Sequence, residues 1–402
     1  MITKISKAEA VRQKAEDFYD YGKNIRAHLH KYPELSNKEF NTSRFLKKQC
    51  EDMGLEIYEI EASTAFVARL SGNEKGKSVG IRTDIDALPI KEDIYNLSKE
   101  RSYISKNDGV MHACGHDGHM AIALTSAKIL SQFKDILKGD VYFIFEKAEE
   151  TCEGSYEMVE FLKDKNIDAI YGNHLDPKLP IGKVNIGDGV VQAGSMGIDF
   201  DLYGKEGHGS RPDKSISPIQ AMVKIVDNLE SIWLSNFDPR DNISLSIGSI
   251  NAGSAPNIIP DKANLKGTAR FIKNETGEVA LELLKDIVES TAKLYSCKIE
   301  FNDYTKIVTY PTINDDFLGN LAKNSASELF DDILVDKELS FGSETFSAYS
   351  RLCPIVFSQL GIKNLKYGSG SDIHTRNFDL DPRVIFYGSA LASNFALNFL
   401  NN

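Results

Sequence analysis

Side chains that bind transition metals are concentrated in one short run, Met111-His-Ala-Cys-Gly-His-Asp-Gly-His119. This run holds three of the 8 histidines and one of the 5 cysteines of the chain. Imidazole and thiolate are preferred ligands of zinc and similar ions, and carboxylates often complete the coordination shell. Gly115 allows the backbone to turn Cys114 and His116 toward one point. The run therefore predicts a metal site, although a chance cluster of polar loop residues is the alternative.

Composition sets limits on the rest of the molecule. A length of 402 residues is sufficient for about two domains. The net charge of -11 disfavours nucleic acid as a partner, because phosphate backbones require a basic surface. We expect no role at a membrane, because the sequence has no signal-peptide core and no apolar stretch of spanning length. The cysteines are few, odd in number and widely spaced, which indicates a reduced, cytoplasmic protein.

The first part of the chain predicts an α/β domain with a mostly parallel sheet and helices on both faces. Strands are expected at 79–84, 141–145 and 169–173, and a helix at 117–133 that Asp117 could cap. Asp84, Asp86, the Glu149-Glu150 pair and His174 all fall at or just past the ends of expected strands. Ligands bind at that edge of an open α/β sheet. Residues from about 302 onward resume this character and end in an apolar helix at 389–400.

Residues 190–301 have a different pattern. Strands are expected at 194–203, 243–250 and 263–271, and amphipathic helices at 216–234 and 275–295. Two helices on an antiparallel sheet make a compact α+β unit of ferredoxin-like type. We therefore expect a catalytic domain of residues 1–189 and 302–402, with residues 190–301 inserted into it as a lid and dimerisation domain.

Several other residues are candidates for the site. Glu149 and Glu150 permit a division of labour in which one carboxylate binds metal and the other accepts a proton from water, although acidic pairs are also common on surfaces. Together with Cys114 and His116, the histidines His174 and His374 would supply enough donors for two catalytic metals with open positions. A lone histidine is nevertheless more often an ordinary polar residue than a ligand.

Three candidates lie within residues 190–301. His208 stands among glycines, where a plain turn residue is an equally good interpretation. Arg270 could pair with a substrate carboxylate, but most arginines are solvated surface residues. Asn257 is similarly weak taken alone.

Together, the motifs resemble those of the aminoacylase and carboxypeptidase metallohydrolase family. More narrowly, they resemble its amidohydrolase branch, which includes hippurate hydrolases, plant auxin-conjugate hydrolases and bacterial N-acyl amino acid deacylases. The matches run in order over nearly the whole chain, and the Cys-Gly-His-Asp run is the most specific of them. The matching segments are 28–35, 82–89, 111–119, 148–150, 207–212, 257–260 and 342–346.

The resemblance implies a function and a ligand set. The chain would be a metal-dependent amidohydrolase that cleaves N-acyl amino acids or related conjugates with water activated by two divalent ions, zinc, manganese or cobalt. Glu149 would be the general base. The second domain would form a homodimer, His208 would reach the partner's active site, and Asn257 and Arg270 would help to hold substrate. The ligands implied are Cys114, His116, Glu150, His174 and His374.

The sequence departs from the family pattern at three places, and none of them removes an implied ligand or the base. Glu146-Lys147 replaces the usual Gln-Pro, Thr345 replaces an aspartate, and Arg376 replaces a proline. These changes bear on the choice of substrate. A metal-dependent carboxypeptidase or dipeptidase is the nearest alternative function, and a non-catalytic metal-binding protein is the alternative of a different class.

Overall fold

The chain folds into two compact units in a computed structural model that describes residues 6–401. The first unit contains Met1–Gly189, Ile313–Glu338 and Ala348–Asn402, and the second contains Val190–Thr312 and Leu339–Ser347. The second unit thus extends past residue 301, the boundary expected from the sequence. The short strand β14 (Ile307–Thr309) lies past that residue and still pairs with the sheet of this unit, as β13 (Lys298–Phe301) does just before it.

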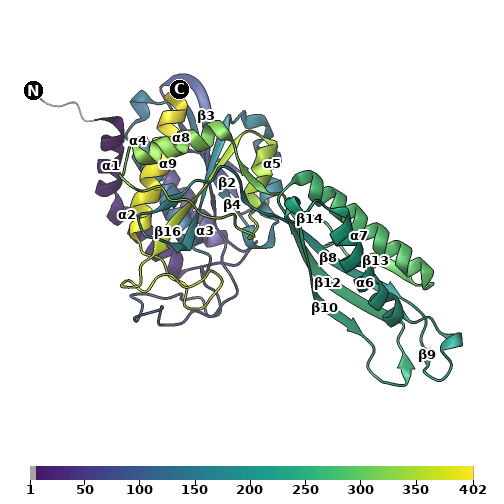
Figure 1. Ribbon diagram of the computed structural model, residues 1–402. Coiled ribbons are helices and arrows are strands. Elements are labelled where there is room, and N and C mark those ends of the chain that lie inside the picture. Colours follow the sequence, from purple (N-terminus) through teal and green to yellow (C-terminus); the bar gives the residue numbers. More distant parts are fainter. Residues whose placement is uncertain (1–5, 402) are drawn as a thin grey trace, which may run out of the picture. The chain divides into compact units, whose positions relative to one another are not determined.

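A seven-stranded mixed sheet forms the centre of the first unit (Figure 1). Its four middle strands are parallel to one another, and antiparallel strands flank them on both sides. The α/β fold expected from the alternating pattern is therefore confirmed. In spatial order, the strands are β1 (Glu56–Glu59), β2 (Phe66–Ser71), β4 (Lys138–Glu146), β3 (Glu74–Asp84), β5 (Ala169–Pro180), β16 (Ile355–Lys363) and β6 (Val184–Asn185).

Helices cover both faces of this sheet and bury its apolar side chains (Figure 1). The middle strands are buried along most of their length, as expected for parallel strands covered on two sides. The helix that begins within the run 111–119, α4, is buried at nearly every residue. The helices are α1 (Lys7–Asp17), α2 (Tyr19–Lys31), α3 (Phe40–Asp52), α4 (His116–Ser131), α5 (Gly154–Leu162), α8 (Asp316–Ser327) and α9 (Arg383–Asn401).

Two local expectations were wrong. Asp117 does not cap α4; Gly115 occupies the N-cap position, and Asp117 lies in the first turn, where its carboxylate binds buried cationic side chains. His174 does not follow its strand, because β5 continues to Pro180. The longer strand is stabilised by its pairing with β16, whose register places Gln359 beside His174.

The second unit contains an antiparallel sheet whose buried side chains pack with two helices around a separate apolar core. The strands β10 (Ser244–Ala252), β12 (Lys262–Phe271) and β8 (Gly194–Tyr203) are neighbours in this order, with β13 and β14 beside β8. The helices are α6 (Pro218–Asn236) and α7 (Asn274–Leu294). Two short strands, β9 (Gly207–His208) and β11 (Ile258–Ile259), form an antiparallel pair. β7 (Gly189–Gln192) and β15 (Thr312–Asn314) lie where the chain passes between the units. No helix in residues 6–401 is long and apolar enough to cross a membrane.

A buried ionic network fixes α2 against the start of α4. His30 Nδ1 lies 2.8 Å from Asp117 Oδ2, and His30 Nε2 lies 2.8 Å from Glu92 Oε1. Arg26 Nε also donates to Asp117 Oδ2, at 3.0 Å. Burial disfavours a charged imidazole, but the two carboxylates outweigh this effect and raise the pKa of His30 from 6.5 to about 9.

The network predicts that stability depends on pH. A charged His30 is favoured in the folded state, so its contribution is complete below pH 6.5 and is lost as the pH rises through about 9. The lost contribution is about 3–4 kcal/mol, because one pKa unit corresponds to roughly 1.4 kcal/mol. Urea unfolding of the wild type and of His30→Gln checks this. The stability difference between the two proteins should shrink from pH 6.5 to pH 10, and a constant difference would contradict the assignment.

Candidate metal centre and catalytic base

The start of α4 brings two metal-binding side chains together. Gly115 has a φ of 87°, in the left-handed region that favours glycine, and it turns the chain from the Cys114 loop into the helix. A Cβ at this position would lie 3.0 Å from Leu175 Cδ1, so the turn is also closely packed. As a result, Cys114 and His116 are both buried beside the carboxyl half of β5.

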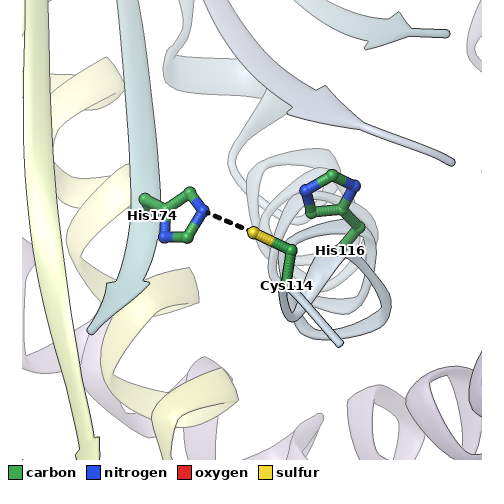
Figure 2. Close-up of side chains that lie close together, drawn as sticks. All are labelled: Cys114, His116 and His174. Atoms are coloured by element: carbon green, nitrogen blue, oxygen red, sulfur yellow. Dashed lines mark hydrogen bonds between the residues drawn. The ribbon is translucent and has the colours of Figure 1, made fainter. Parts of the chain in front are cut away.

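Figure 2 shows His174 of β5 facing this turn. Its Nε2 lies 3.3 Å from Cys114 Sγ, and its Nδ1 lies 2.8 Å from the Leu175 carbonyl oxygen. The carbonyl can only accept a hydrogen bond, so the proton of a neutral His174 is on Nδ1. The lone pair of Nε2 is then directed toward the thiol.

Glu150 joins the site from a strained loop that follows β4. Ala148 has a φ of 49°, which is rare for a residue with a side chain, and its N–H donates to the buried carboxylate of Glu39 at 2.9 Å. The next residues form the short 3-10 helix η2 (Glu149–Thr151). The Glu150 N–H donates to Asp86 Oδ2 at 3.1 Å, which fixes this turn to the loop after β3. Strained backbone of this kind is concentrated at functional sites.

His374 approaches Glu150 from the C-terminal part of the unit. It also has a positive φ, of 60°, and its N–H donates to the Ala113 carbonyl at 2.8 Å. Its Nε2 lies 3.4 Å from Glu150 Oε2, and its side chain is 47% exposed. The site is therefore buried on the Cys114 side and accessible on the His374 side.

The side chains implied as ligands by the sequence resemblance lie within reach of common ions. In each of three groups, one ligand atom per residue lies within 4.8 Å of the others. His116 connects two of these groups and Cys114 connects two, so the five residues surround adjoining positions. The groups are Cys114 with His116 and His174, Cys114 with Glu150 and His374, and His116 with Glu149 and Glu150.

The chemistry of the donors fits divalent metal ions. His116 Nε2 and Glu150 Oε1 lie 3.7 Å apart, and both are buried without a hydrogen-bond partner. Buried polar atoms are rarely left in this state, and coordination to a cation would satisfy both. The set of thiolate, imidazole and carboxylate suits zinc, and also other first-row divalent ions.

The electrostatics favour a cation as well. Burial raises the pKa of the Cys114 thiol well above its ordinary value, so the thiolate requires a compensating positive charge. Burial opposes a charged His116, but Asp84 and Asp86 raise its pKa well above the usual range. In Glu150, burial is outweighed by a hydrogen bond from His374 and by the charge of His116, which lower its pKa. A divalent ion would take the place of protons in this charged pocket.

Glu149 lies on the same 3-10 turn as Glu150. One of its oxygens belongs to a group with His116 and Glu150, and its side chain is half-buried. A carboxylate beside a metal position, but reachable from solvent, has the geometry that a general base requires.

Asp86 is a supporting residue to which sequence reasoning assigned no role. Its Oδ1 lies 3.2 Å from His116 Nδ1, while its Oδ2 accepts hydrogen bonds from the Glu150 N–H and from Ser36 Oγ. One carboxylate thus orients two of the candidate ligands, as is usual around protein metal sites. The closely spaced Asp84 and Asp86 after an apolar strand were the available signal.

The three candidates of the second unit have their own local geometry. His208 in β9 pairs with Ile258 in β11, and the Gly209 N–H donates to the Asn257 carbonyl at 2.8 Å. The structure therefore brings His208 and Asn257 together. Arg270 lies on β12, and its Nε donates to the Phe341 carbonyl at 3.3 Å.

Known proteins resemble this chain over most of its length. The sequence pattern of peptidase family M20/M25/M40 matches residues 80–398. Thermostable carboxypeptidase 1 of Saccharolobus solfataricus is 32% identical over 98% of this chain and 99% of its own length. N-acetylcysteine deacetylase of Bacillus subtilis is 33% identical over 93% of this chain and 95% of its own. The crystal structure of the Bacillus subtilis YXEP protein, a dinuclear metal-binding peptidase, is 30% identical and covers 96% of this chain and 99% of its own, with a TM-score of 0.81.

The α/β fold and the cluster of thiol, imidazole and carboxylate groups define a metal-dependent hydrolase. The resemblance seen in the sequence is confirmed by the comparisons, which extend over nearly the full chain. The chain belongs to peptidase family M20/M25/M40 and is a metal-dependent amidohydrolase.

The thiol predicts a spectroscopic property. Cobalt added to the metal-free wild type should produce sulfur-to-cobalt charge-transfer absorption in the near ultraviolet, because Cys114 would be a ligand. Cys114→Ser should lack this band. Its metal affinity should also fall by more than the roughly 10- to 100-fold that accompanies loss of a supporting hydrogen bond.

Cys353→Ser is the matched control. Cys353 is a half-buried cysteine just before β16, at the end of the strand pair where Ile355 faces Ile170, and it belongs to none of the groups of candidate ligands above. This variant should keep the charge-transfer band and the wild-type affinity. An unchanged band in Cys114→Ser would exclude the thiol as a ligand.

Proposed function

We propose that the protein hydrolyses the amide bond of N-acyl amino acids or related small conjugates, with two divalent metal ions per chain. The observation that carries this proposal is the meeting of Cys114, His116, Glu150, His174 and His374 around adjoining positions, with Glu149 on the same turn. The deacetylase relative and the dinuclear metal-binding peptidase support it. Zinc, manganese and cobalt all suit this set of donors.

The five ligand residues would hold the metals, and the metals would supply the Lewis acidity that polarises the amide carbonyl and acidifies water. Glu149 would accept a proton from the attacking water and deliver it to the leaving nitrogen. The Asp86 carboxylate would keep His116 and Glu150 in place. The exposed His374 side would admit the substrate.

We also propose that the second unit acts as a lid and dimerisation domain. In this proposal, His208 donates a hydrogen bond to the developing oxyanion in the partner subunit's site, while Asn257 and Arg270 hold the substrate. His208 is exposed, so its ring is accessible to a second subunit. Its Nδ1 is paired with Ser210 Oγ at 2.8 Å. A cytoplasmic location is part of the proposal. It is supported by the absence of disulfide bonds in residues 6–401 and by the need to keep Cys114 reduced.

A second candidate function is hydrolysis of peptide bonds at a C-terminus or in dipeptides. It is favoured by the relative named as a carboxypeptidase, which is almost as similar as the deacetylase. Release of free amino acids from N-acetyl amino acids, compared with dipeptides, separates the two functions. Metal binding without hydrolysis of any compound would instead support a non-catalytic protein.

Replacement of the general base is the sharpest test of the mechanism. Glu149→Gln should bind metal as the wild type does, and its kcat should fall by about 100- to 10,000-fold because a positioned base is lost. Glu160→Gln, which alters an exposed carboxylate on α5 that pairs with Lys163, should leave kcat unchanged. Ordinary turnover by Glu149→Gln would exclude Glu149 as the base.

Mixed dimers test the role of His208. His208→Ala should lower kcat by about 100- to 1000-fold, the usual effect of removing an oxyanion donor. If His208 acts in the partner's site, dimers of a Glu149→Gln subunit and a His208→Ala subunit contain one intact site and regain activity. Mixed dimers that stay inactive would show that His208 acts within its own chain, and wild-type turnover by His208→Ala itself would show that His208 has no catalytic role.

A further inference from the structure

His119 is a histidine of the metal-binding run that has no place in the proposed ligand set. Its side chain is fully buried, and both ring nitrogens have partners. Nε2 accepts a hydrogen bond from the Leu175 N–H at 3.0 Å, and Nδ1 lies 2.8 Å from Asp84 Oδ1. A backbone N–H can only donate, so Nε2 contributes its lone pair and Nδ1 carries the proton.

This arrangement argues against His119 as a ligand, although His119, Asp84 and His116 lie close enough together to hold an ion. The Nε2 lone pair is already directed at the Leu175 N–H, and Nδ1–H donates to Asp84. Asp84 is in turn neutralised by Arg82, whose Nη1 donates to Asp84 Oδ2 at 2.8 Å. An ion bound by His119 would have to displace one of the two hydrogen bonds of its ring.

The main chain of Leu175 connects His119 to a proposed ligand. Its N–H is held by His119, while its carbonyl oxygen accepts the Nδ1 proton of His174 at 2.8 Å. The two imidazole rings are also in edge contact, with centroids 4.7 Å apart. The orientation of His174, and with it the direction of Nε2 toward Cys114 Sγ, therefore depends on where the Leu175 backbone is held.

Buried charges fix the other end of this chain of hydrogen bonds. Arg82 Nε donates to Glu146 Oε2 at 2.8 Å, and Tyr349 Oη donates to the same oxygen at 2.7 Å. Asp84 remains ionised, because its interactions with His116, His119 and Arg82 overcome burial and lower its pKa well below the usual range. Glu146, one of the departures from the family pattern, thus balances the charge of a buried arginine.

We propose that His119 is a positioning residue that sets the tautomer and orientation of His174. It does so through the Leu175 backbone, and it is itself anchored by Asp84 on β3. The proposal rests on the proposed role of His174 as a metal ligand. It explains why a third imidazole belongs to the run without binding metal: one turn of α4 after His116, it joins β3, α4 and β5 at the edge where the ligands meet.

Two substitutions separate the two hydrogen bonds of His119. In His119→Gln, the side-chain oxygen takes the place of Nε2 and can accept the Leu175 N–H. In His119→Asn, the amide nitrogen takes the place of Nδ1 and can donate to Asp84, but nothing reaches Leu175. Affinity for cobalt is measured for the full-length protein by competition with a chelator, together with the number of ions bound and the cobalt absorption spectrum. Thermal unfolding of the metal-free proteins reports the structural cost.

The proposal expects His119→Asn to bind the same number of ions as the wild type with about 10- to 100-fold lower affinity, as for loss of a supporting contact to a ligand. His119→Gln should regain most of the affinity and the wild-type cobalt spectrum, even if both variants unfold at the same lowered temperature. Nitrogen NMR of the metal-free wild type should show His119 and His174 in the Nδ1–H tautomer.

Three results would overturn the proposal. Loss of an ion in both variants would make His119 a ligand, and wild-type affinity in His119→Asn would mean that the Leu175 contact does not matter. Equal loss of affinity in both variants, in step with stability, would indicate a general structural role. His174→Ala is measured in parallel: if it binds cobalt normally, the proposed ligand set has failed, which is distinguishable from failure of His119 alone.

Discussion

The turn between Cys114 and His116 is the constraint on which the rest of the site depends. It places a thiol and an imidazole in a buried pocket, at the start of a helix that is itself almost wholly buried. Such a pocket disfavours both a thiolate and unpaired nitrogen and oxygen atoms. A divalent cation would stabilise the thiolate and would also coordinate the unpaired atoms. The buried pocket that the fold creates therefore favours metal binding.

The surrounding structure holds the site rigidly, and two residues near it have a strained backbone. Ala148 and His374 both adopt the left-handed conformation, and each is held by a hydrogen bond from its own N–H to a buried acceptor. In the roles proposed above, Asp86 and His119 add side-chain contacts that orient neighbouring candidate ligands. A catalytic metal centre needs this preorganisation, because the catalytic rate falls when ligands must be repositioned during each turnover.

The sequence predicted the fold class and the candidate ligands, but it did not predict several local features of the backbone or the supporting contacts. The α/β fold followed from alternating patterns, and the five ligand candidates followed from motif resemblance, because residue type and order carry that information. The true N-cap at Gly115 and the extension of β5 past His174 did not follow, since they depend on tertiary pairing with β16 and on a left-handed turn. The roles of Asp86 and His119 depend on which atoms face each other across three elements, which no linear pattern records.

The most direct test of the account is metal titration of the chelator-stripped, full-length protein while release of amino acid from an N-acetyl amino acid is followed. The account predicts no hydrolysis by the stripped protein and a rate that rises with added zinc, manganese or cobalt until about two ions are bound per chain. Hydrolysis that continues at the original rate after complete metal removal would contradict the central claim that Cys114, His116, Glu150, His174 and His374 form a catalytic metal centre.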